Sequence, residues 1–319
     1  MIILTGGAGF IGSCFLQKLN SKGINNILVV DNLAQTDKWK NLIGKKYLGY
    51  EHKSDFIERL EFGELNGQVE AIFHIGACST TTETDIDYLY DNNVNYSRVL
   101  AEFAIVENIP FHYASSAATY GLGENGYSDS SFENLKPLNG YGWSKHSFDE
   151  WVLANDYQDR FTGYKYFNVF GPNEYHKGSM SSMIFKAFEQ VSESEKIRLF
   201  KSNHPDYIDG GQMRDFVYVK DVVNIMWDFY QKKTTGIYNI GTGIARSWND
   251  LAKAVFASME KKENIEYFEM PDNLKDQYQN FTQSDNSKFN SVHDYNYMTL
   301  EESVEDYIKN HLSNNWKYL

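Results

Sequence analysis

The stretch MIILTGGAGFIG, residues 1–12, decides most of the fold of this chain. An apolar run over 1–4 precedes glycines at 6, 9 and 12, and a helix-forming stretch follows over 13–22. A strand-to-helix turn needs residues that tolerate positive φ, and a pyrophosphate needs a close backbone and a helix N-terminus. A second strand-like run, 26–30, ends at Asp31, where an acid meets an adenosine ribose. The stretch therefore predicts a dinucleotide site; a purely structural glycine turn is the alternative.

Composition limits the remaining classes of function. The chain has 319 residues, 42% hydrophobic composition and a net charge of −13, which disfavours binding to a nucleic-acid backbone. Two cysteines, Cys14 and Cys78, make no disulfide framework, and no apolar run reaches membrane-spanning length. We therefore expect a cytoplasmic chain with no nucleic-acid partner, no membrane partner and no metal site.

Strand-like and helix-like runs alternate through the first half, which predicts an α/β fold with a doubly wound parallel (Rossmann) sheet. Strands are expected at 69–74, 110–114 and 163–167, and helices at 54–60, 85–108 and 140–157. The second half is mixed, with helices expected at 179–191, 221–231, 248–259 and 300–311, and strands at 216–219 and 237–240. We expect a dinucleotide-binding domain over 1–168, to which 214–245 returns, and a smaller mixed α/β substrate-binding lobe over 169–319.

Tyr141 and Lys145 lie four residues apart in a predicted helix and therefore share one face. A tyrosine hydroxyl with a pKa near ~10 is a weak base at neutral pH, and a neighbouring ammonium favours its ionised form. The chain has 23 tyrosines, so this spacing also arises by chance, and its value comes from following a dinucleotide fingerprint. Ser116, at the end of a predicted strand, could hydrogen-bond a reacting oxygen; a turn or cap role is its alternative.

Longer blocks resemble a known family. The glycine fingerprint, the Ser–Tyr–Lys set, NVFGP at 168–172 and RDFV at 214–217 resemble the extended short-chain dehydrogenases/reductases that act on nucleotide sugars. DNL at 31–33, GACS at 76–79, HKGSM at 176–180 and YQNFTQ at 278–283 are similar to the ADP-heptose 6-epimerases of that group. The similarity covers almost the whole chain.

The resemblance implies an isomerase that inverts carbon 6 of the heptose in ADP-D-glycero-D-manno-heptose, giving ADP-L-glycero-D-manno-heptose for the lipopolysaccharide inner core. Carbon 6 bears no acidic hydrogen, so the family oxidises it to a ketone with a tightly bound nicotinamide cofactor and returns the hydride to the opposite face. Each face needs a proton acceptor and donor, and the family's pair maps onto Tyr141 and Lys177. From the residues alone, Lys177 would be interpreted as a solvated loop lysine. The family also forms homo-oligomers, often pentamers.

The resemblance assigns residues to three roles. The catalytic set is Tyr141, Lys177, Lys145 and Ser116. The cofactor-binding set is Gly6, Gly9, Phe10, Ile11, Gly12, Asp31, Asn32, Lys38, Lys53, Ile75, Gly76, Ala77, Cys78, Ser79, Asn92, Lys145, Val169 and Lys177. The substrate-binding set is Ser116, Asn168, Ser179, Lys186, Phe200, Lys201, Ser202, Arg214 and Tyr278.

Two of these assignments have alternatives. Asp31 favours NAD because a carboxylate repels a 2′-phosphate, yet Asn32, Lys38 and Lys53 fall where the family places its phosphate-side contacts. We expect NADP, one per subunit, with NAD as the alternative. A guanidinium matches a diphosphate in fork geometry, which makes Arg214 the most specific substrate candidate. Its alternative is a structural ion pair with Asp215 or another acid.

Other functions remain open. A UDP-sugar 4-epimerase on the same fold would not need Lys177, and a 4,6-dehydratase would need an acid where this chain has Ala117 and Ala118. A non-catalytic dinucleotide-binding protein should have lost part of the Ser–Tyr–Lys set, which is complete here. The chain departs from the family pattern at Ile75, Gly140, Lys186 and a longer loop over 203–213.

Overall fold

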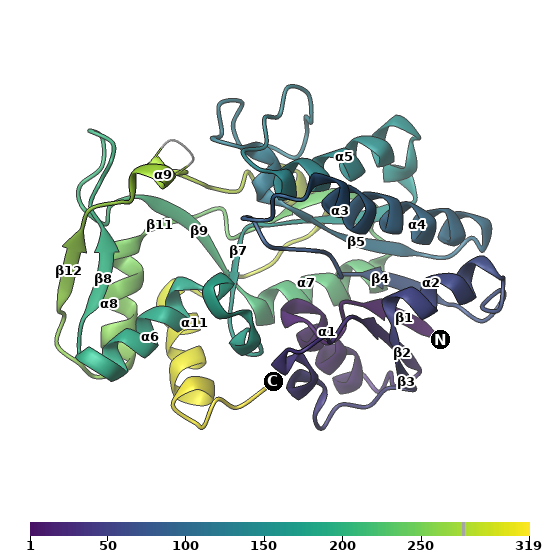
Figure 1. The fold of residues 1–319 in the computed structure, drawn as a ribbon, viewed down its shortest axis with the longest axis horizontal. Helices are drawn as coiled ribbons and strands as arrows, with labels where there is room; N and C mark the ends of the chain where they lie inside the picture. Colours follow the sequence, from purple (N-terminus) through teal and green to yellow (C-terminus); the bar gives the residue numbers. More distant parts are fainter. Residues whose placement is uncertain (276–277) are drawn as a thin grey trace. The chain divides into compact units, whose positions relative to one another are not determined.

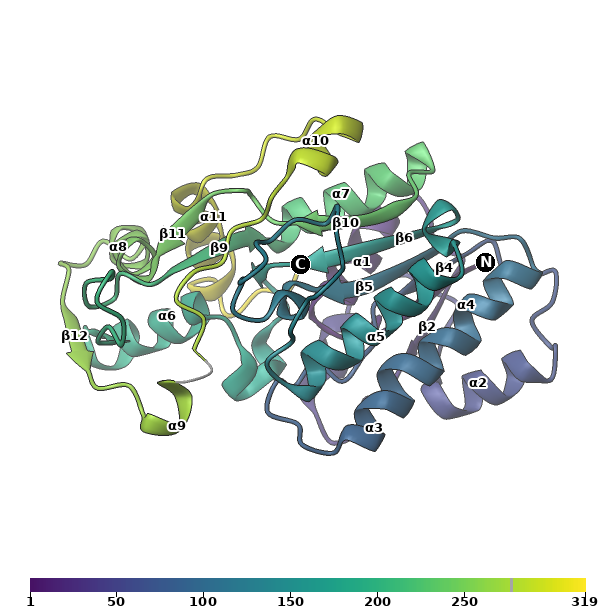
Figure 2. The same cartoon turned by 90° about the horizontal axis from the view of Figure 1, so that it is seen from above.

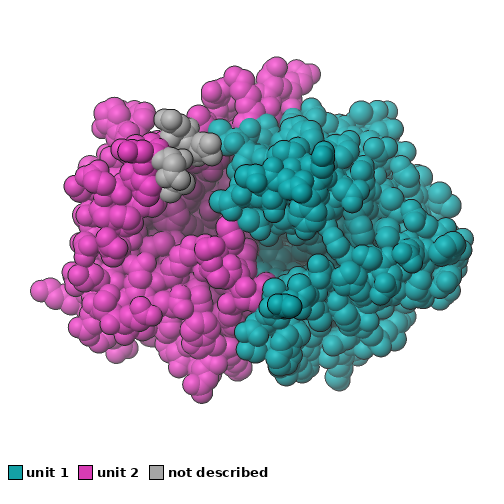
Figure 3. Space-filling view, viewed as in Figure 1, with its two compact units in different colours: residues 1–119, 137–166, 222–238 teal, residues 120–136, 167–221, 239–319 magenta. Residues whose placement is uncertain are grey.

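The computed structural model describes residues 1–275 and 278–319, which form two compact units (Figure 3). Unit 1 comprises 1–119, 137–166 and 222–238; unit 2 comprises 120–136, 167–221 and 239–319. The predicted boundary at 168, with its cofactor and substrate roles, stays a prediction. Within the described residues, no helix combines the length and apolar character that a membrane crossing needs.

A seven-stranded sheet forms the centre of unit 1 (Figure 1), which confirms the predicted fold class. Its order is β10 (Gly236–Ile240), β6 (Phe161–Tyr166), β5 (Phe111–Ser116), β4 (Ala71–His74), β1 (Ile2–Thr5), β2 (Ile27–Asp31) and β3 (Gly49–His52). Pairing is parallel from β6 through β3. The strands β1, β4 and β6 are buried along their whole length, as expected of a sheet covered on both faces.

The strand order reverses at β1, because the chain builds β2 and β3 on one side before β4 pairs on the other. Ligands of open α/β sheets bind at the carboxyl ends of the strands at such a reversal. The predicted glycine turn follows β1, and the segment 75–79 follows β4. The fold therefore brings these two predicted cofactor segments to one edge of the sheet.

Helices cover both faces of this sheet (Figure 2). One face carries α2 (Lys53–Glu61), α3 (Ile86–Tyr90), α4 (Tyr96–Val106) and α5 (Gly140–Ala154); the other carries α1 (Phe10–Ser21) and α7 (Val219–Lys232). The single helix predicted at 85–108 is instead α3 and α4, separated by a π-helical turn, Asp91–Asn95. Asn139 begins α5 by accepting the backbone N–H of Gly142 at 2.9 Å.

Unit 2 contains two small sheets. One has the order β11 (Ala245–Ser247), β9 (Met213–Tyr218), β7 (Asn168–Phe170), and the other pairs β12 (Ile265–Phe268) with β8 (Ile197–Phe200). Its helices are α6 (Met183–Ser194), α8 (Trp248–Ser258), α9 (Asp272–Lys275), α10 (Ser287–Val292) and α11 (Leu300–Tyr307). The sequence analysis missed β7, β8, β11 and β12, because strands of three or four residues show too little alternation to be recognised.

A fully buried ion pair joins β6 to α5 in unit 1. The Lys165 Nζ atom lies 2.7 Å from Asp149 Oδ2, and both side chains have no exposed surface. The same carboxylate accepts the hydroxyls of Tyr113 at 3.0 Å and Ser115 at 2.7 Å, while the Lys165 ammonium also donates to Thr119 at 2.8 Å. Every polar atom of the pair therefore has partners, as a buried charge requires.

Removing one member of this pair should be costly. We expect Lys165→Met to lower the free energy of unfolding by about 3–5 kcal/mol, because it leaves the buried Asp149 carboxylate without its cation. Urea denaturation followed by circular dichroism would measure the change. The double variant Lys165→Met/Asp149→Asn should recover part of the loss, and Lys309→Met, in an exposed helical pair with Glu305, should change little. If Lys165→Met and Lys309→Met lower the free energy of unfolding equally, the buried pair contributes no more to stability than an exposed pair does.

Candidate active site

Close backbone contacts shape the cofactor end of unit 1. Gly6 has φ +65°, and a Cβ atom placed there would lie 2.5 Å from the backbone nitrogen of Gly76. A Cβ atom at Gly12 would lie 2.1 Å from the Gly6 carbonyl oxygen. The N-cap of α1 is Gly9, which has no side chain to accept a hydrogen bond from the first turn. The segment therefore offers a tight backbone cradle and an uncapped helix N-terminus, the two features that hold a pyrophosphate.

Asp31 ends β2 beside this cradle and is almost fully buried. Its Oδ2 accepts the Ala8 N–H at 2.9 Å, while its Oδ1 accepts the Asn32 N–H at 2.7 Å and the Lys38 ammonium at 2.8 Å. The carboxylate is thus bound to the glycine turn on one side and neutralised by a cation on the other. A ligand group bound next to Asp31 would therefore face a carboxylate whose charge is balanced by the Lys38 ammonium, not an unpaired negative charge.

A pocket of about 150 Å³ lies at this edge of unit 1. Among the residues predicted to bind the cofactor, it is lined by Gly6, Asp31, Asn32, Lys38, Lys53, Gly76, Ala77, Cys78 and Asn92. The Lys53 ammonium donates to the Asn92 side-chain oxygen. The glycine-rich backbone cradle fits the pyrophosphate of a dinucleotide, and the carboxylate and the lysines fit its ribose. Of the other predicted cofactor residues in this unit, Gly9 caps α1, Phe10 is buried in that helix, and Ser79 is exposed.

His74 belongs to the same pocket but was not predicted. It accepts or donates at both ring nitrogens, with Nδ1 2.7 Å from Thr5 Oγ1 and Nε2 2.8 Å from Ser97 Oγ. Burial, with a contribution from the Lys145 cation, lowers the pKa of His74 to about 3. This imidazole is therefore neutral at physiological pH and acts as a fixed link between β1, β4 and α4.

Asn93, in the π-helical turn, is the second missed residue. Its amide oxygen accepts the Cys78 N–H at 2.8 Å, and its amide nitrogen donates to the Cys78 carbonyl at 3.0 Å and to Ser144 Oγ at 3.0 Å. The buried amide thus fastens the segment after β4 to α5, between Tyr141 and Lys145. π-turns often occur at functional sites for this reason, since the extra residue redirects a side chain.

Ser116 ends β5, and Tyr141 lies in the first turn of α5. Burial raises the pKa of Tyr141, and the Ser116 hydroxyl partly opposes that shift. A Cβ atom at Gly142 would lie 2.8 Å from the Ala118 carbonyl oxygen, so glycine at this position lets α5 approach the segment after β5. Gly140, which departs from the family pattern, faces Ile86, whose Cδ1 would lie 2.5 Å from an added Cβ. The departure is therefore explained by the close packing of α3 on α5.

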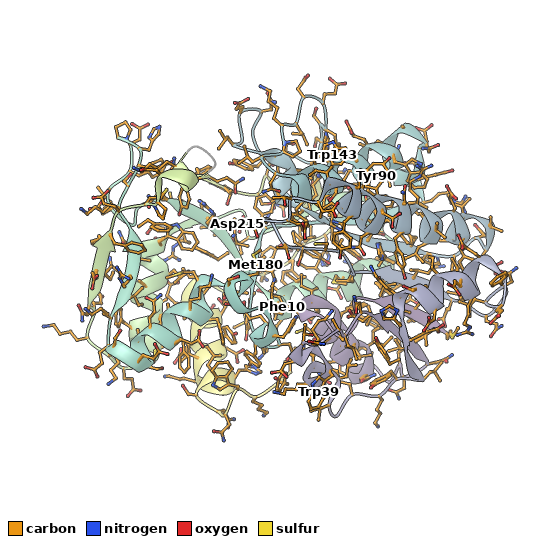
Figure 4. All side chains as sticks on the ribbon, in the orientation of Figure 1. Phe10, Trp39, Tyr90, Trp143, Met180 and Asp215 are labelled. Carbon is orange, nitrogen blue, oxygen red and sulfur yellow. The ribbon has the colours of Figure 1, made fainter. Side chains whose placement is uncertain are left out.

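Lys145 lies one turn after Tyr141 on α5, and its Nζ donates to the Ala114 carbonyl at 2.9 Å. Burial lowers the pKa of Lys145 to about 8, and the Asp149 carboxylate one further turn along opposes the shift. The structure thus brings Ser116, Tyr141 and Lys145 to the same end of β5 and α5. Nearby, Tyr90 and Trp143, both labelled in Figure 4, stack with ring centroids 5.6 Å apart.

Unit 2 contains a cavity of about 550 Å³ between β7, β8 and α6. Rings form much of its wall: Phe167, Phe200, Phe216, Trp248, Phe268 and Tyr278. Asn168, Val169 and Lys186 also line it, as does Met180, labelled in Figure 4. Aromatic walls with a few polar groups suit an organic ligand that carries a flat ring.

Arg214 lies beside this cavity on β9 and is nearly buried. Its guanidinium carbon lies 5.1 Å from the Tyr278 ring centre and 5.5 Å from that of Trp248, and its Nη1 donates to the Met213 carbonyl at 2.8 Å. Across the described residues, no carboxylate lies within ion-pair distance of Arg214. The neighbouring Asp215 carboxylate, labelled in Figure 4, instead accepts N–H groups of Thr242, Gly243 and Ser284.

Lys177 lies in a 3₁₀ segment, Tyr175–Met180, of unit 2. Burial lowers the pKa of Lys177, the Glu174 carboxylate raises it, and the Lys186 ammonium lowers it further. A lysine with a lowered pKa exchanges protons more readily at neutral pH. Lys186 itself donates to the Ser179 carbonyl at 2.6 Å.

Comparison with known proteins agrees with this geometry. The family model described as "NAD dependent epimerase/dehydratase family" matches residues 2–241. This chain belongs to that family.

Several curated members are similar over their full length. A protein named ADP-L-glycero-D-manno-heptose-6-epimerase from Nitratidesulfovibrio vulgaris is 48% identical over 317 residues, 98% of each chain. One of the same name from Fusobacterium nucleatum is 46% identical over 335 residues and covers all of both chains. The crystal structure of the Helicobacter pylori ADP-L-glycero-D-manno-heptose-6-epimerase has a TM-score of 0.81 at 26% identity, covering 97% of this chain and 95% of its own.

Within this epimerase/dehydratase chain, some predicted residues lie outside the two pockets. Ile75 is held in the segment after β4, where its N–H donates to the Thr5 carbonyl at 3.1 Å. Lys201 forms an exposed ion pair with Glu269 at 2.7 Å, and the Ser202 N–H donates to Asp209 at 2.9 Å. Ser179 is exposed. The ligand roles predicted for these residues stay predictions.

The contrast between Arg214 and Asp215 can be tested by stability. We expect Arg214→Met to change the free energy of unfolding by less than about 1 kcal/mol. The variant loses the contacts between the guanidinium and the two rings, but it also no longer has to bury a positive charge. Asp215→Asn should lower the free energy of unfolding by about 1–3 kcal/mol. The NH₂ group of the new asparagine would face buried backbone N–H groups, and two donors cannot form a hydrogen bond with each other. Urea denaturation of both variants measures the difference. Strong destabilisation by Arg214→Met would show that Arg214 is a structural residue.

Proposed function

We propose that this protein epimerises carbon 6 of the heptose in ADP-D-glycero-D-manno-heptose, giving ADP-L-glycero-D-manno-heptose for the lipopolysaccharide inner core. The observation that carries the proposal is 48% identity over 98% of the chain to a relative named for this activity. The side-chain set of unit 1 supports it, since Ser116 ends β5 while Tyr141 and Lys145 lie one turn apart on α5. The chain is thus an isomerase that uses a nicotinamide cofactor.

The chemical problem is that carbon 6 bears no acidic hydrogen, so direct proton abstraction cannot invert it. A nicotinamide dinucleotide supplies a reversible hydride acceptor, so that carbon 6 becomes a ketone and is then reduced from its opposite face without net redox change. The Tyr141 phenolate oxygen would accept the proton of the 6-hydroxyl group of one epimer, and the resulting Tyr141 hydroxyl would return it. Lys177 Nζ does the same for the other epimer.

The charges around these two groups suit proton exchange. Burial raises the pKa of Tyr141, and the Ser116 side chain opposes part of that rise. Lys145, whose pKa is about 8, is still mostly charged at pH 7 and favours the tyrosinate electrostatically. Lys177 has a pKa below its ordinary value because of burial. Burial thus moves the pKa of Lys177 toward the neutral range in which a general acid/base works best, while Ser116 limits the rise that burial causes in the pKa of Tyr141.

The cavity of unit 2 suits the ADP part of the substrate. Its phenyl, indole and phenol rings offer faces for adenine, and Asn168 and Lys186 offer polar groups for sugar and phosphate oxygens. Arg214, buried between Tyr278 and Trp248, matches a diphosphate in bidentate geometry. Lys201, Ser202, Ser179 and Phe200 complete the proposed substrate set. A UDP-sugar 4-epimerase remains the alternative, although that reaction would not need Lys177 as a second acid/base.

For the cofactor we propose NADP, bound by the residues predicted above. The Lys38 ammonium compensates Asp31, and the Lys53 ammonium lines the same pocket, so two cations can receive a 2′-phosphate. Val169 and Lys177 complete the proposed contacts from unit 2. We further propose a homo-oligomer, with the pentamer of the family as its expected form.

The decisive experiment is incubation with ADP-D-glycero-D-manno-heptose in deuterated water, followed by proton NMR. We expect inversion at carbon 6 with no deuterium at that carbon, because the hydride returns without entering solvent. Tyr141→Phe and Lys177→Met should each lower turnover at least ~100-fold while the cofactor stays bound, since general acid/base groups contribute about 10²–10⁴. Turnover of UDP-galactose alone, or deuterium at carbon 6, would contradict the proposal.

Cofactor choice has its own test. Lys38→Ala should weaken NADP at least ~10-fold more than NAD, because removing the ammonium both uncovers Asp31 and deletes a phosphate partner. Isothermal titration of cofactor-free protein with each dinucleotide gives the two dissociation constants. Lys40→Ala, which removes an exposed lysine paired with Asp37, is the matched control. Equal losses for NAD and NADP would mean that Lys38 does not contact the 2′-phosphate.

A further inference from the structure

The segment between β7 and α6 carries Lys177 and closes on one buried carboxylate. Glu174 has only 1% of its surface exposed. Its Oε1 accepts the Gly171 N–H at 3.2 Å and the Ser182 hydroxyl at 2.8 Å, while its Oε2 accepts the Ser182 N–H at 2.5 Å. Ser182 is also the N-cap of α6, where it accepts the Phe185 N–H at 3.2 Å. One side chain therefore holds both ends of the segment 171–182.

Lys177 lies inside this closed segment, three residues after the carboxylate. Its backbone N–H donates to the Glu174 carbonyl at 2.9 Å. Gly178 follows with φ +53° and ψ −123°, a conformation that strongly favours glycine, and its carbonyl accepts the Ser181 N–H at 3.0 Å. The Lys186 ammonium, from α6, donates to the Ser179 carbonyl at 2.6 Å. The backbone around Lys177 is thus fixed from both sides.

We propose that Glu174 is a positioning residue for Lys177: its buried carboxylate closes the segment 171–182 and attracts the Lys177 ammonium, while the Lys186 ammonium repels it. The inference rests on the proposed function, because Lys177 must exchange a proton in both directions. The attraction favours the protonated state of Lys177, and the repulsion favours its neutral state.

The electrostatics of the described residues agree with this geometry. Burial raises the pKa of Glu174, while its bonds to Ser182 and Gly171 and the charge of Lys177 lower it. In turn, Glu174 raises the pKa of Lys177, and Lys186 lowers it. The other titratable group facing Glu174 is Tyr307 of α11, whose pKa lies well above its ordinary value because of burial and the carboxylate. Tyr307 is therefore a neutral phenol and adds no charge beside Glu174, while Glu189 of α6 also interacts with the Lys186 ammonium.

The test measures the titration of Lys177 directly, in cofactor-free full-length protein. Limited labelling with acetic anhydride between pH 6 and pH 11, read by mass spectrometry of the peptide that contains Lys177, gives its apparent pKa. Glu174→Gln keeps the shape and one acceptor oxygen but removes the negative charge, so the profile should move down by roughly one pH unit. Lys186→Met removes the repelling cation, so the profile should move up. Glu193→Gln, exposed on the same helix α6, is the control and should move neither way.

Turnover supplies a second measurement. Glu174→Gln should lower kcat about 10-fold with little change in KM, and Glu174→Asp, which keeps the charge, should recover part of the loss. If Glu174→Gln fails to fold, the labelling profile of Lys186→Met decides, and an unshifted Lys177 profile in that variant overturns the inference. Unchanged profiles in Glu174→Gln and Lys186→Met overturn it equally. Near-normal turnover in Lys177→Met would instead overturn the proposed proton role of Lys177, whatever the labelling profiles show.

Discussion

The cofactor end of unit 1 depends on a backbone approach that a single methyl group would prevent. The turn after β1 and the segment after β4 come so close at Gly6 and Gly76 that a Cβ at Gly6 would meet a backbone nitrogen at 2.5 Å. The β1–β4 pairing aligns Thr5 with His74, and the His74–Thr5 hydrogen bond joins the two strands just before this contact. The segment 75–79 is then fixed to α5 by Asn93. Pocket shape and the position of the Tyr141 helix therefore follow from the same close contact.

The two units treat a functional lysine in the same physical way. Burial lowers the pKa of Lys145 in unit 1 and that of Lys177 in unit 2. A more deeply buried carboxylate opposes the shift in both cases, Asp149 for Lys145 and Glu174 for Lys177. Burial alone would neutralise a lysine, and a close ion pair alone would keep it charged. In both lysines the lowering by burial outweighs the opposing carboxylate, because the pKa of each lies below its ordinary value.

The features predicted correctly from the sequence are local ones. The glycine turn, Asp31 and the helix that carries Tyr141 and Lys145 each follow from residues within one or two turns of each other. Asp149 could also have been found, because it lies four residues after Lys145 on the same helix face. His74 and Asn93 could not, since His74 bonds Ser97 across 23 positions and Asn93 bonds Ser144 across 51. The π-turn that positions Asn93 leaves no periodic signal in the sequence. The stretch 85–108 is therefore predicted as one continuous helix.

Arg214 shows why residue type alone did not decide its role. Arg–Asp neighbours suggested either a structural pair or a ligand group, and both were consistent with the sequence. In the structure the Asp215 carboxylate accepts three backbone N–H groups and the Thr242 hydroxyl, so its acceptor capacity is used inside the fold. The Arg214 guanidinium faces two rings instead, which stabilise a cation without neutralising it. Burying a cation that keeps its full charge is costly in free energy. The diphosphate proposed as the ligand of Arg214 would offset this cost, because an anion pairs with the guanidinium.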